Sequence, residues 1–172
     1  MAALLVVAGL AFAAPTPAIA GSGGTGMKPQ PRTVAGARAK LVNGFAVAPN
    51  NAPGPVKRVI AAANHIAKGH PYCWGGGHSS FKSSCYDCSG SVSYALHGGG
   101  LLAIPHAANF ASWAKGGKGR WISVYANSSH VWMTVAGLRF DTSDTPGQGP
   151  GWAKGIGYET PSAFTVRHPG SF

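Results

Sequence analysis

Three cysteines lie close together, and their spacing permits several kinds of chemistry. Cys85 and Cys88 stand three positions apart in "CYDCSG", and Cys73 lies shortly upstream in "CWGGGH". A C-x-x-C pair can exchange disulfides, ligate a metal, or contain one nucleophilic thiolate beside a bystander. Cys88 falls where "DCSGSVSYALHGGG" predicts the start of a helix. The helix dipole and the free N–H groups at that point stabilise an anion, which favours Cys88 as a thiolate nucleophile beside an oxyanion site.

A thiolate nucleophile needs a base that a third group orients. His130 opens the apolar segment "HVWMTVAG", and Asp141 lies near the end of the next segment, "LRFDTS". If the two segments pair as a tight hairpin about residues 136–137, Asp141 returns to the neighbourhood of His130. The residues alone leave open a plainer interpretation, in which His130 begins a strand and Asp141 caps a turn. Three other histidines fall in loops that can line a cleft: His70, His78 and His106.

The elements that must position these side chains follow from the apolar pattern. Helices are predicted over 55–69 and from Asp87 or Cys88 to about Gly98, and a short third helix is predicted after Pro105. Strands are predicted over 120–126, 130–137, 138–143 and 162–168. Helices that precede strands indicate an α+β domain with N-terminal helices packed on an antiparallel sheet.

The chain divides into three regions. Residues 1–20 have the apolar run and small-x-small ending of a signal peptide, with cleavage after Ala20, and the run is too short to span a bilayer. Residues 21–54 are rich in Gly, Pro and Ala and are predicted to form a flexible linker. The folded domain is predicted to span residues 55–172. Within it, the loop 143–158, which contains Trp152 and Tyr158, either covers the cleft or is plain surface.

The charge balance indicates an anionic partner. Lys and Arg number 14 against 4 Asp and Glu, for a formal net charge of +10. The basic residues are scattered singly, so nucleic acid is not the expected partner. An exported basic protein is expected to meet the anionic polymers of a cell wall. A charge that serves solubility alone, with no partner, is the other interpretation.

Three segments together resemble a known family. "PYCWGG", "YDCSGSVSYAL" and "SSHVWMTVAGLRFD" look like the signature of the NlpC-type cysteine peptidases, which are papain-like cell-wall hydrolases. The resemblance covers roughly residues 55–143. It implies a papain-like fold and hydrolysis of amide bonds in peptidoglycan stem peptides, most often between D-glutamate and the diamino acid. It also implies a monomer that is secreted or associated with the cell wall, with no cofactor and no metal.

The resemblance assigns the catalytic roles residue by residue. Cys88 falls on the nucleophile, His130 on the base and Asp141 on the orienting third position. Tyr72 falls on the tyrosine whose hydroxyl helps to hold the oxyanion.

The remaining motif residues take supporting roles in the resemblance. Asp87 and Ser89 fall on positions that contact the bound stem peptide. Cys73 and Cys85 are additions to the common pattern. A bond from either of them to Cys88 would silence the nucleophile, so a Cys73–Cys85 disulfide is the pairing compatible with activity.

Four alternatives remain at this stage. One is an N-acetylmuramoyl-L-alanine amidase of the same fold. Another is a thiol–disulfide oxidoreductase that uses Cys85 and Cys88, although such pairs normally follow a strand in a βαβ unit and here the strands come afterwards. A third is a wall-binding module without activity. The fourth is a zinc site, for which a second ligand pair at suitable spacing is missing.

Overall fold

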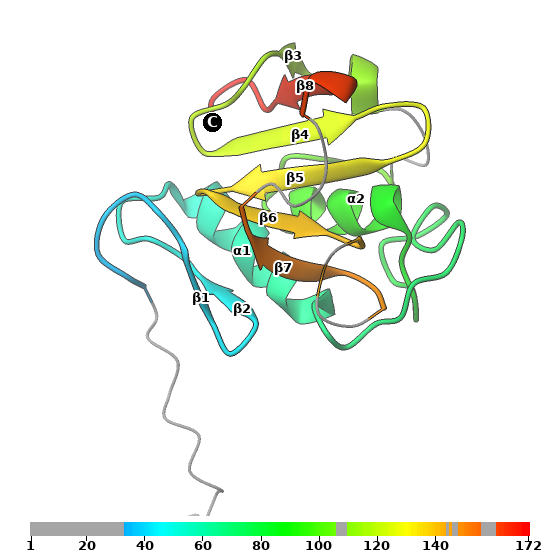
Figure 1. The fold of residues 1–172 in the computed structure, drawn as a ribbon, viewed down its shortest axis with the longest axis horizontal. Coiled ribbons are helices and arrows are strands. Elements are labelled where there is room, and N and C mark those ends of the chain that lie inside the picture. Colours follow the sequence, from blue (N-terminus) through cyan, green and yellow to red (C-terminus); the bar gives the residue numbers. More distant parts are fainter. Residues whose placement is uncertain (1–32, 106–109, 144, 146–147, 156–160) are drawn as a thin grey trace, which may run out of the picture.

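The computed structural model describes residues 33–172 except 106–109, 144, 146–147 and 156–160. The expected signal peptide and residues 21–32 of the expected linker lie outside the described residues. The fold is α+β, as predicted: two helices lie against one face of a six-stranded antiparallel sheet (Figure 1). None of the described helices has the length and apolar character required to cross a membrane.

The two main helices carry the apolar faces expected from the sequence. α1 spans Gly54–Ile66 and α2 spans Cys88–Gly98. The buried side chains of α1 recur at helical spacing: Val56, Val59, Ile60, Ala63 and Ile66. The helices pack on each other and on the inner face of the sheet in one hydrophobic core.

The sheet runs in the order β3 (Lys115–Gly116), β8 (Thr165–His168), β4 (Ile122–Ala126), β5 (Val131–Val135), β6 (Leu138–Asp141) and β7 (Gly151–Lys154). β5 and β6 pair with Val135 opposite Leu138. Ala136 and Gly137 form the two-residue turn between them, with φ of 49° and 86°, as a tight hairpin of this kind requires. This hairpin was predicted from the sequence, and it determines which residues meet at the far end of the strand pair.

Residues 33–53 do not form the expected linker. They contain a hairpin of β1 (Lys40–Val42) and β2 (Phe45–Val47), and the side chains of Ala39, Ala46, Ala48 and Ala52 are buried in the core. The Asn64 amide on α1 holds this segment, because it accepts from the Ala46 N–H at 2.9 Å and donates to the Ala46 carbonyl at 2.8 Å. The fold therefore extends ahead of the expected start at residue 55.

Two further expectations differ from the structure. The helix expected after Pro105 is reduced, over the described residues, to one 3-10 turn at Phe110–Ser112. β7 lies within the expected loop 143–158, and Trp152 is 1% exposed, packed on Phe140 with a donor bond to Asn64. Trp152 is thus a core residue rather than part of a cleft, whereas Tyr158 lies outside the described residues.

Candidate active site

Cys88 is the first residue of α2, and Asp87 is its N-cap. The Asp87 carboxylate accepts from the Gly90 N–H at 2.8 Å, which satisfies one of the free donors of the first turn. Gly90 permits the helix to approach the glycine-rich loop, since a Cβ there would lie 1.9 Å from the Gly76 carbonyl oxygen. The motif residues around Cys88 are therefore those that the backbone geometry requires.

Asp87 also holds the loop that faces the helix start. Its carboxylate accepts from the Gly75 N–H at 3.1 Å and from the Ser89 hydroxyl at 3.1 Å, and it lies 2.7 Å from Nε2 of His78. Ser89 Oγ is in turn 2.8 Å from the same nitrogen of His78. Asp87 is 3% exposed and Ser89 7%, so their polar atoms face protein partners. These contacts give Asp87 and Ser89 a positioning role, and both residues also line the cleft that contains Cys88, where contact with a stem peptide stays a prediction.

His130 and Asp141 meet at the end of the hairpin. When the register of β5 and β6 is continued by one step, Asp141 stands diagonal to His130 on the same face. Nε2 of His130 lies 2.8 Å from the Asp141 carboxylate. The Asn127 side chain accepts from the His130 N–H at 2.8 Å, so the preceding turn also holds the histidine backbone.

The electrostatics of His130 favour its cationic form. Burial alone lowers the pKa of the imidazole, but hydrogen bonds with Asp141 and Cys88, together with the negative charges of both, raise its pKa from 6.5 to about 10. Nε2 is the ring nitrogen that bonds Asp141. The geometry brings all three residues of the expected triad into one hydrogen-bonded chain.

Arg139 is a participant that sequence reasoning missed. Its guanidinium donates to the second oxygen of Asp141, and both side chains are 0% exposed. The guanidinium also lies over the Trp132 ring, 4.9 Å from its centroid. The available signal was an arginine two positions before the aspartate in a short strand, since alternate residues share one face.

The Tyr72 hydroxyl lies within the electrostatic reach of Cys88. Burial raises its pKa, and the negative charges of Cys88 and Asp87 raise it further. The Tyr72 side chain is 42% exposed, which leaves it accessible from solvent.

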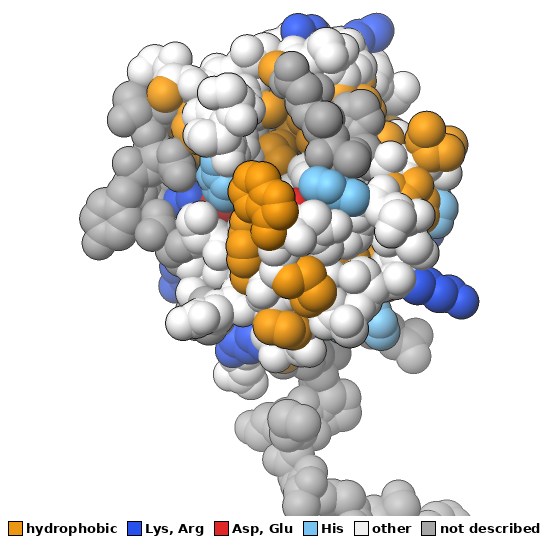
Figure 2. Space-filling view, turned by 90° about the vertical axis from the view of Figure 1, so that its right-hand side faces the viewer, with side chains coloured by type: hydrophobic (Ala, Val, Ile, Leu, Met, Phe, Trp, Pro, Cys, Tyr) orange, Lys and Arg blue, Asp and Glu red, His pale blue; other side chains and the backbone are white. Residues whose placement is uncertain are grey.

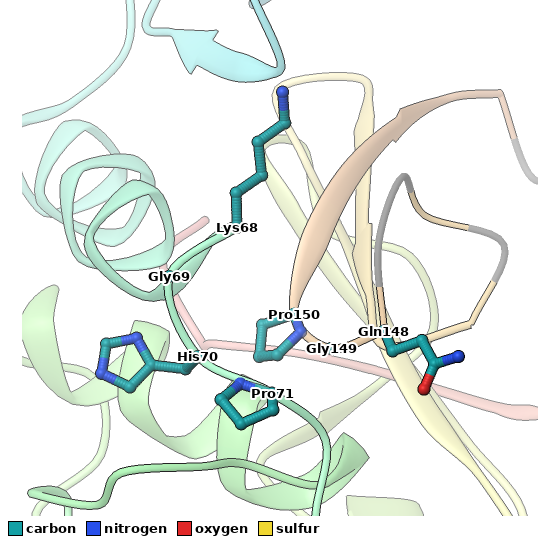
Figure 3. Close-up of a pocket in the computed structure, with 7 residues that line it drawn as sticks. All are labelled: Lys68, Gly69, His70, Pro71, Gln148, Gly149 and Pro150. Atoms are coloured by element: carbon teal, nitrogen blue, oxygen red, sulfur yellow. The ribbon is translucent and has the colours of Figure 1, made fainter.

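Backbone hydrogen bonds between two loops, here called the seam, hold the backbone of Tyr72. Its N–H donates to the Gln148 carbonyl at 3.0 Å, and the Lys68 N–H donates to Pro150 at 3.2 Å. A hollow of about 270 Å³ lies at this seam, lined by Lys68, Gly69, His70, Pro71, Gln148, Gly149 and Pro150. The side chains of Lys68, His70 and Gln148 point away from one another (Figure 3), so no group of reactive atoms converges there.

Cys88 and His130 share a cleft of about 440 Å³ with Asn127, Phe110 and Trp74. Trp74 is 88% exposed. Figure 2 shows one face of the molecule, on which apolar side chains lie between two groups of histidine side chains. Acidic side chains are visible only beneath these groups, and Lys and Arg side chains lie at the edges of the face. The cleft thus combines a polar base with apolar walls, an arrangement typical of a ligand site.

A disulfide joins Cys73 and Cys85, whose Cα atoms lie 5.6 Å apart, and Cys88 is a free, partly exposed cysteine. The bond closes the loop that carries Trp74 and the glycines. It also occupies Cys85, so the dithiol that an oxidoreductase would need is absent.

Replacing both Cys73 and Cys85 by serine should lower the free energy of unfolding by about 3 kcal/mol, because a 12-residue separation is released in the unfolded chain. Urea denaturation of the oxidised protein and the double variant measures the difference. Thiol titration of the unreduced native protein should find one reactive thiol, located at Cys88 by peptide mapping. Finding three thiols there would contradict the pairing.

Within the described part of the chain, no three His, Cys, Asp or Glu side chains gather as metal ligands.

No protein-family model and no curated protein sequence matches the chain. Solved structures do. The peptidoglycan hydrolase RipB from Mycobacterium tuberculosis superimposes with a TM-score of 0.50 at 21% identity, over 66% of this chain and 64% of that chain. RipD from the same organism, described as a non-catalytic NlpC/p60 domain protein adapted to peptidoglycan binding, gives 0.48 at 18% identity, over 67% of this chain and 98% of that chain. The likeness confirms the papain-like NlpC/p60-type fold.

Proposed function

We propose that this chain is a secreted cysteine peptidase that hydrolyses amide bonds in peptidoglycan stem peptides. The observation that supports it best is the hydrogen-bonded chain from Cys88 through His130 to Asp141, set in an open cleft. The fold it shares with RipB, a peptidoglycan hydrolase, supports the wall as the setting. The apolar run at residues 1–20 supports export.

The reaction follows from the geometry of these residues. The Cys88 thiolate attacks the amide carbonyl carbon, and the carbonyl electrons move to oxygen. The backbone N–H groups at the start of α2 and the Tyr72 hydroxyl stabilise that oxyanion. The His130 imidazolium then donates its proton to the leaving nitrogen, the C–N bond breaks, and a thioester remains. The neutral imidazole next removes a proton from water, which attacks the thioester and releases a carboxylic acid.

Asp141 keeps the imidazole in one orientation and stabilises its cationic form. Arg139 fixes the second oxygen of that carboxylate, so Asp141 presents a single oxygen to His130.

The bond proposed for cleavage is that between D-glutamate and the diamino acid, on the basis of the sequence resemblance. An amidase of the same fold would instead cut between muramic acid and L-alanine. Mass spectrometry of the fragments released from purified wall distinguishes the two, because only the amidase separates the whole stem peptide from the glycan.

Asp141→Asn should move the alkaline limb of the pH profile of kcat/KM downward by about one to three pH units. In the native protein the pKa of His130 is about 10, so the imidazolium that donates the proton to the leaving nitrogen is lost as pH rises through about 10. The amide removes the negative charge that raises this pKa. Turnover of a soluble muropeptide across pH measures the effect.

The stability of both proteins must be followed across the same pH range. Since the pKa of His130 is raised on folding, its contribution to stability is complete below about 6.5 and disappears as pH rises through about 10. Circular dichroism at each pH separates unfolding from loss of the imidazolium. An alkaline limb that stays in place in the folded variant would contradict the assigned role of Asp141.

A further inference from the structure

Two adjoining cavities lie at the opposite end of β5 and β6 from the triad. One, of about 340 Å³, is lined by Arg38, Lys118 and Arg120. The other, of about 320 Å³, is lined by Lys40 and Lys154. The two cavities share Gly137, in the turn between β5 and β6.

The cations that line these cavities are held on anchored backbone. The Ala39 N–H donates to the Ala136 carbonyl at 2.9 Å, which places Arg38 and Lys40 on either side of an anchored residue. The Ala136 N–H donates to the Trp121 carbonyl at 2.7 Å, which anchors the residue after Arg120. Segments far apart in the sequence thus converge on the β5–β6 turn.

Among the described residues, no Asp or Glu side chain lines these cavities, although the Phe172 carbonyl oxygen lies beside Gly119, between Lys118 and Arg120. Of the described residues, only Asp87 and Asp141 have carboxylate side chains, and both are buried at the candidate active site, 3% and 0% exposed. The Arg38, Lys118 and Arg120 side chains are exposed. A group of exposed cations attracts anions and favours a partner with repeated negative charge.

The chemistry of the lining suits an anion with paired oxygen atoms, such as phosphate. Two of the three cations in the larger cavity are arginines, whose planar guanidinium presents paired donors to phosphate oxygens. Two cavities that share one wall suit consecutive units of a polymer better than a single ion.

We propose that the cavities lined by Arg38, Lys118, Arg120, Lys40 and Lys154 bind a polyol or sugar chain linked by phosphodiesters. The proposal rests on the proposed function only for its setting, the cell wall, where such a chain would hold the enzyme against its substrate. The five-residue strand β5 and Ala136 lie between His130 and Gly137, which corresponds to roughly 20 Å. β5 and β6 run side by side between these two ends (Figure 1). The bound polymer would therefore leave the cleft free for a stem peptide.

The test uses the full chain with Cys88→Ala, so that no wall material is cleaved, and poly(glycerol phosphate) as the probe. The variant Arg38→Gln, Lys118→Gln and Arg120→Gln should bind it about tenfold more weakly by isothermal titration. The matched control is Lys57→Gln, Lys68→Gln and Lys82→Gln, which removes the same charge from sites outside the two cavities, one half-buried and two exposed, and should stay within about twofold of the parent. Thermal melts establish that both variants fold.

If both variants lose the same affinity for the polymer, the effect is due to net charge and the proposed site is wrong. If neither variant loses affinity, the proposed site is also wrong. Polygalacturonate and duplex DNA are the competing probes. If either binds as tightly as the phosphate polymer with the same sensitivity to the first variant, the assigned ligand class is wrong. Activity on soluble muropeptides is measured separately with Cys88 intact. If the native protein shows no activity on muropeptides, the proposed function is wrong and the polymer site is unaffected. If the variant Arg38→Gln, Lys118→Gln and Arg120→Gln binds the polymer as tightly as the parent, only the polymer site is wrong.

Discussion

Replacing Cys88 by alanine should lower the release of fragments from purified sacculi by at least about 10⁴-fold. The substitution removes the atom that forms the thioester, and the remaining groups cannot supply another nucleophile at that position. The fold should be retained, because Asp87 and not Cys88 caps α2. Liquid chromatography with mass spectrometry of the released muropeptides measures the loss, and thermal denaturation verifies the fold.

The histidines provide the matched control for this experiment. His130→Ala should abolish release as Cys88→Ala does. His97→Ala should leave release unchanged, since His97 is exposed near the end of α2 and bonds the Leu102 carbonyl. Equal release by native protein and Cys88→Ala would refute a cysteine mechanism. If the native protein binds sacculi and releases nothing, the chain is a wall-binding protein without activity.

Arg139→Met should lower the free energy of unfolding by about 3–5 kcal/mol. The Asp141 carboxylate is fully buried, and the substitution leaves its charge without the guanidinium that neutralises it. That carboxylate also accepts from the Thr142 N–H at 2.6 Å and bonds His130, and neither partner replaces a buried arginine. Urea denaturation monitored by tryptophan fluorescence measures the change.

The double variant Arg139→Met with Asp141→Asn separates the effect on stability from the effect on activity. It removes both buried charges, so part of the lost stability should return relative to Arg139→Met. Muropeptide release should stay low, because His130 then lacks its carboxylate. If Arg139→Met alone is as stable as the native protein, the buried ion pair does not have the role described.

The parts of the site that were predictable depend on local rules. The N-cap before Cys88 and the two-residue turn at Ala136–Gly137 follow from residue type and spacing, and they place the triad. Arg139 escaped notice because its significance depends on burial, which no local pattern reveals. The β1–β2 hairpin was missed although its signal is local: Asn43 and Gly44 form a two-residue turn, with φ of 52° and 82°, between the apolar segments KLV and FAV.

The β5–β6 hairpin has a consequence for the order in which the protein folds. His130 and Asp141 are 11 residues apart and joined by one tight turn, so loop closure between them is fast. Cys88 must come from an earlier helix and cross a much longer loop, which is entropically slower. We therefore expect the acid–base half of the site to form before the nucleophile reaches it. Alkylation of Cys88 by a neutral reagent, followed during refolding, should accelerate when α2 docks on the sheet.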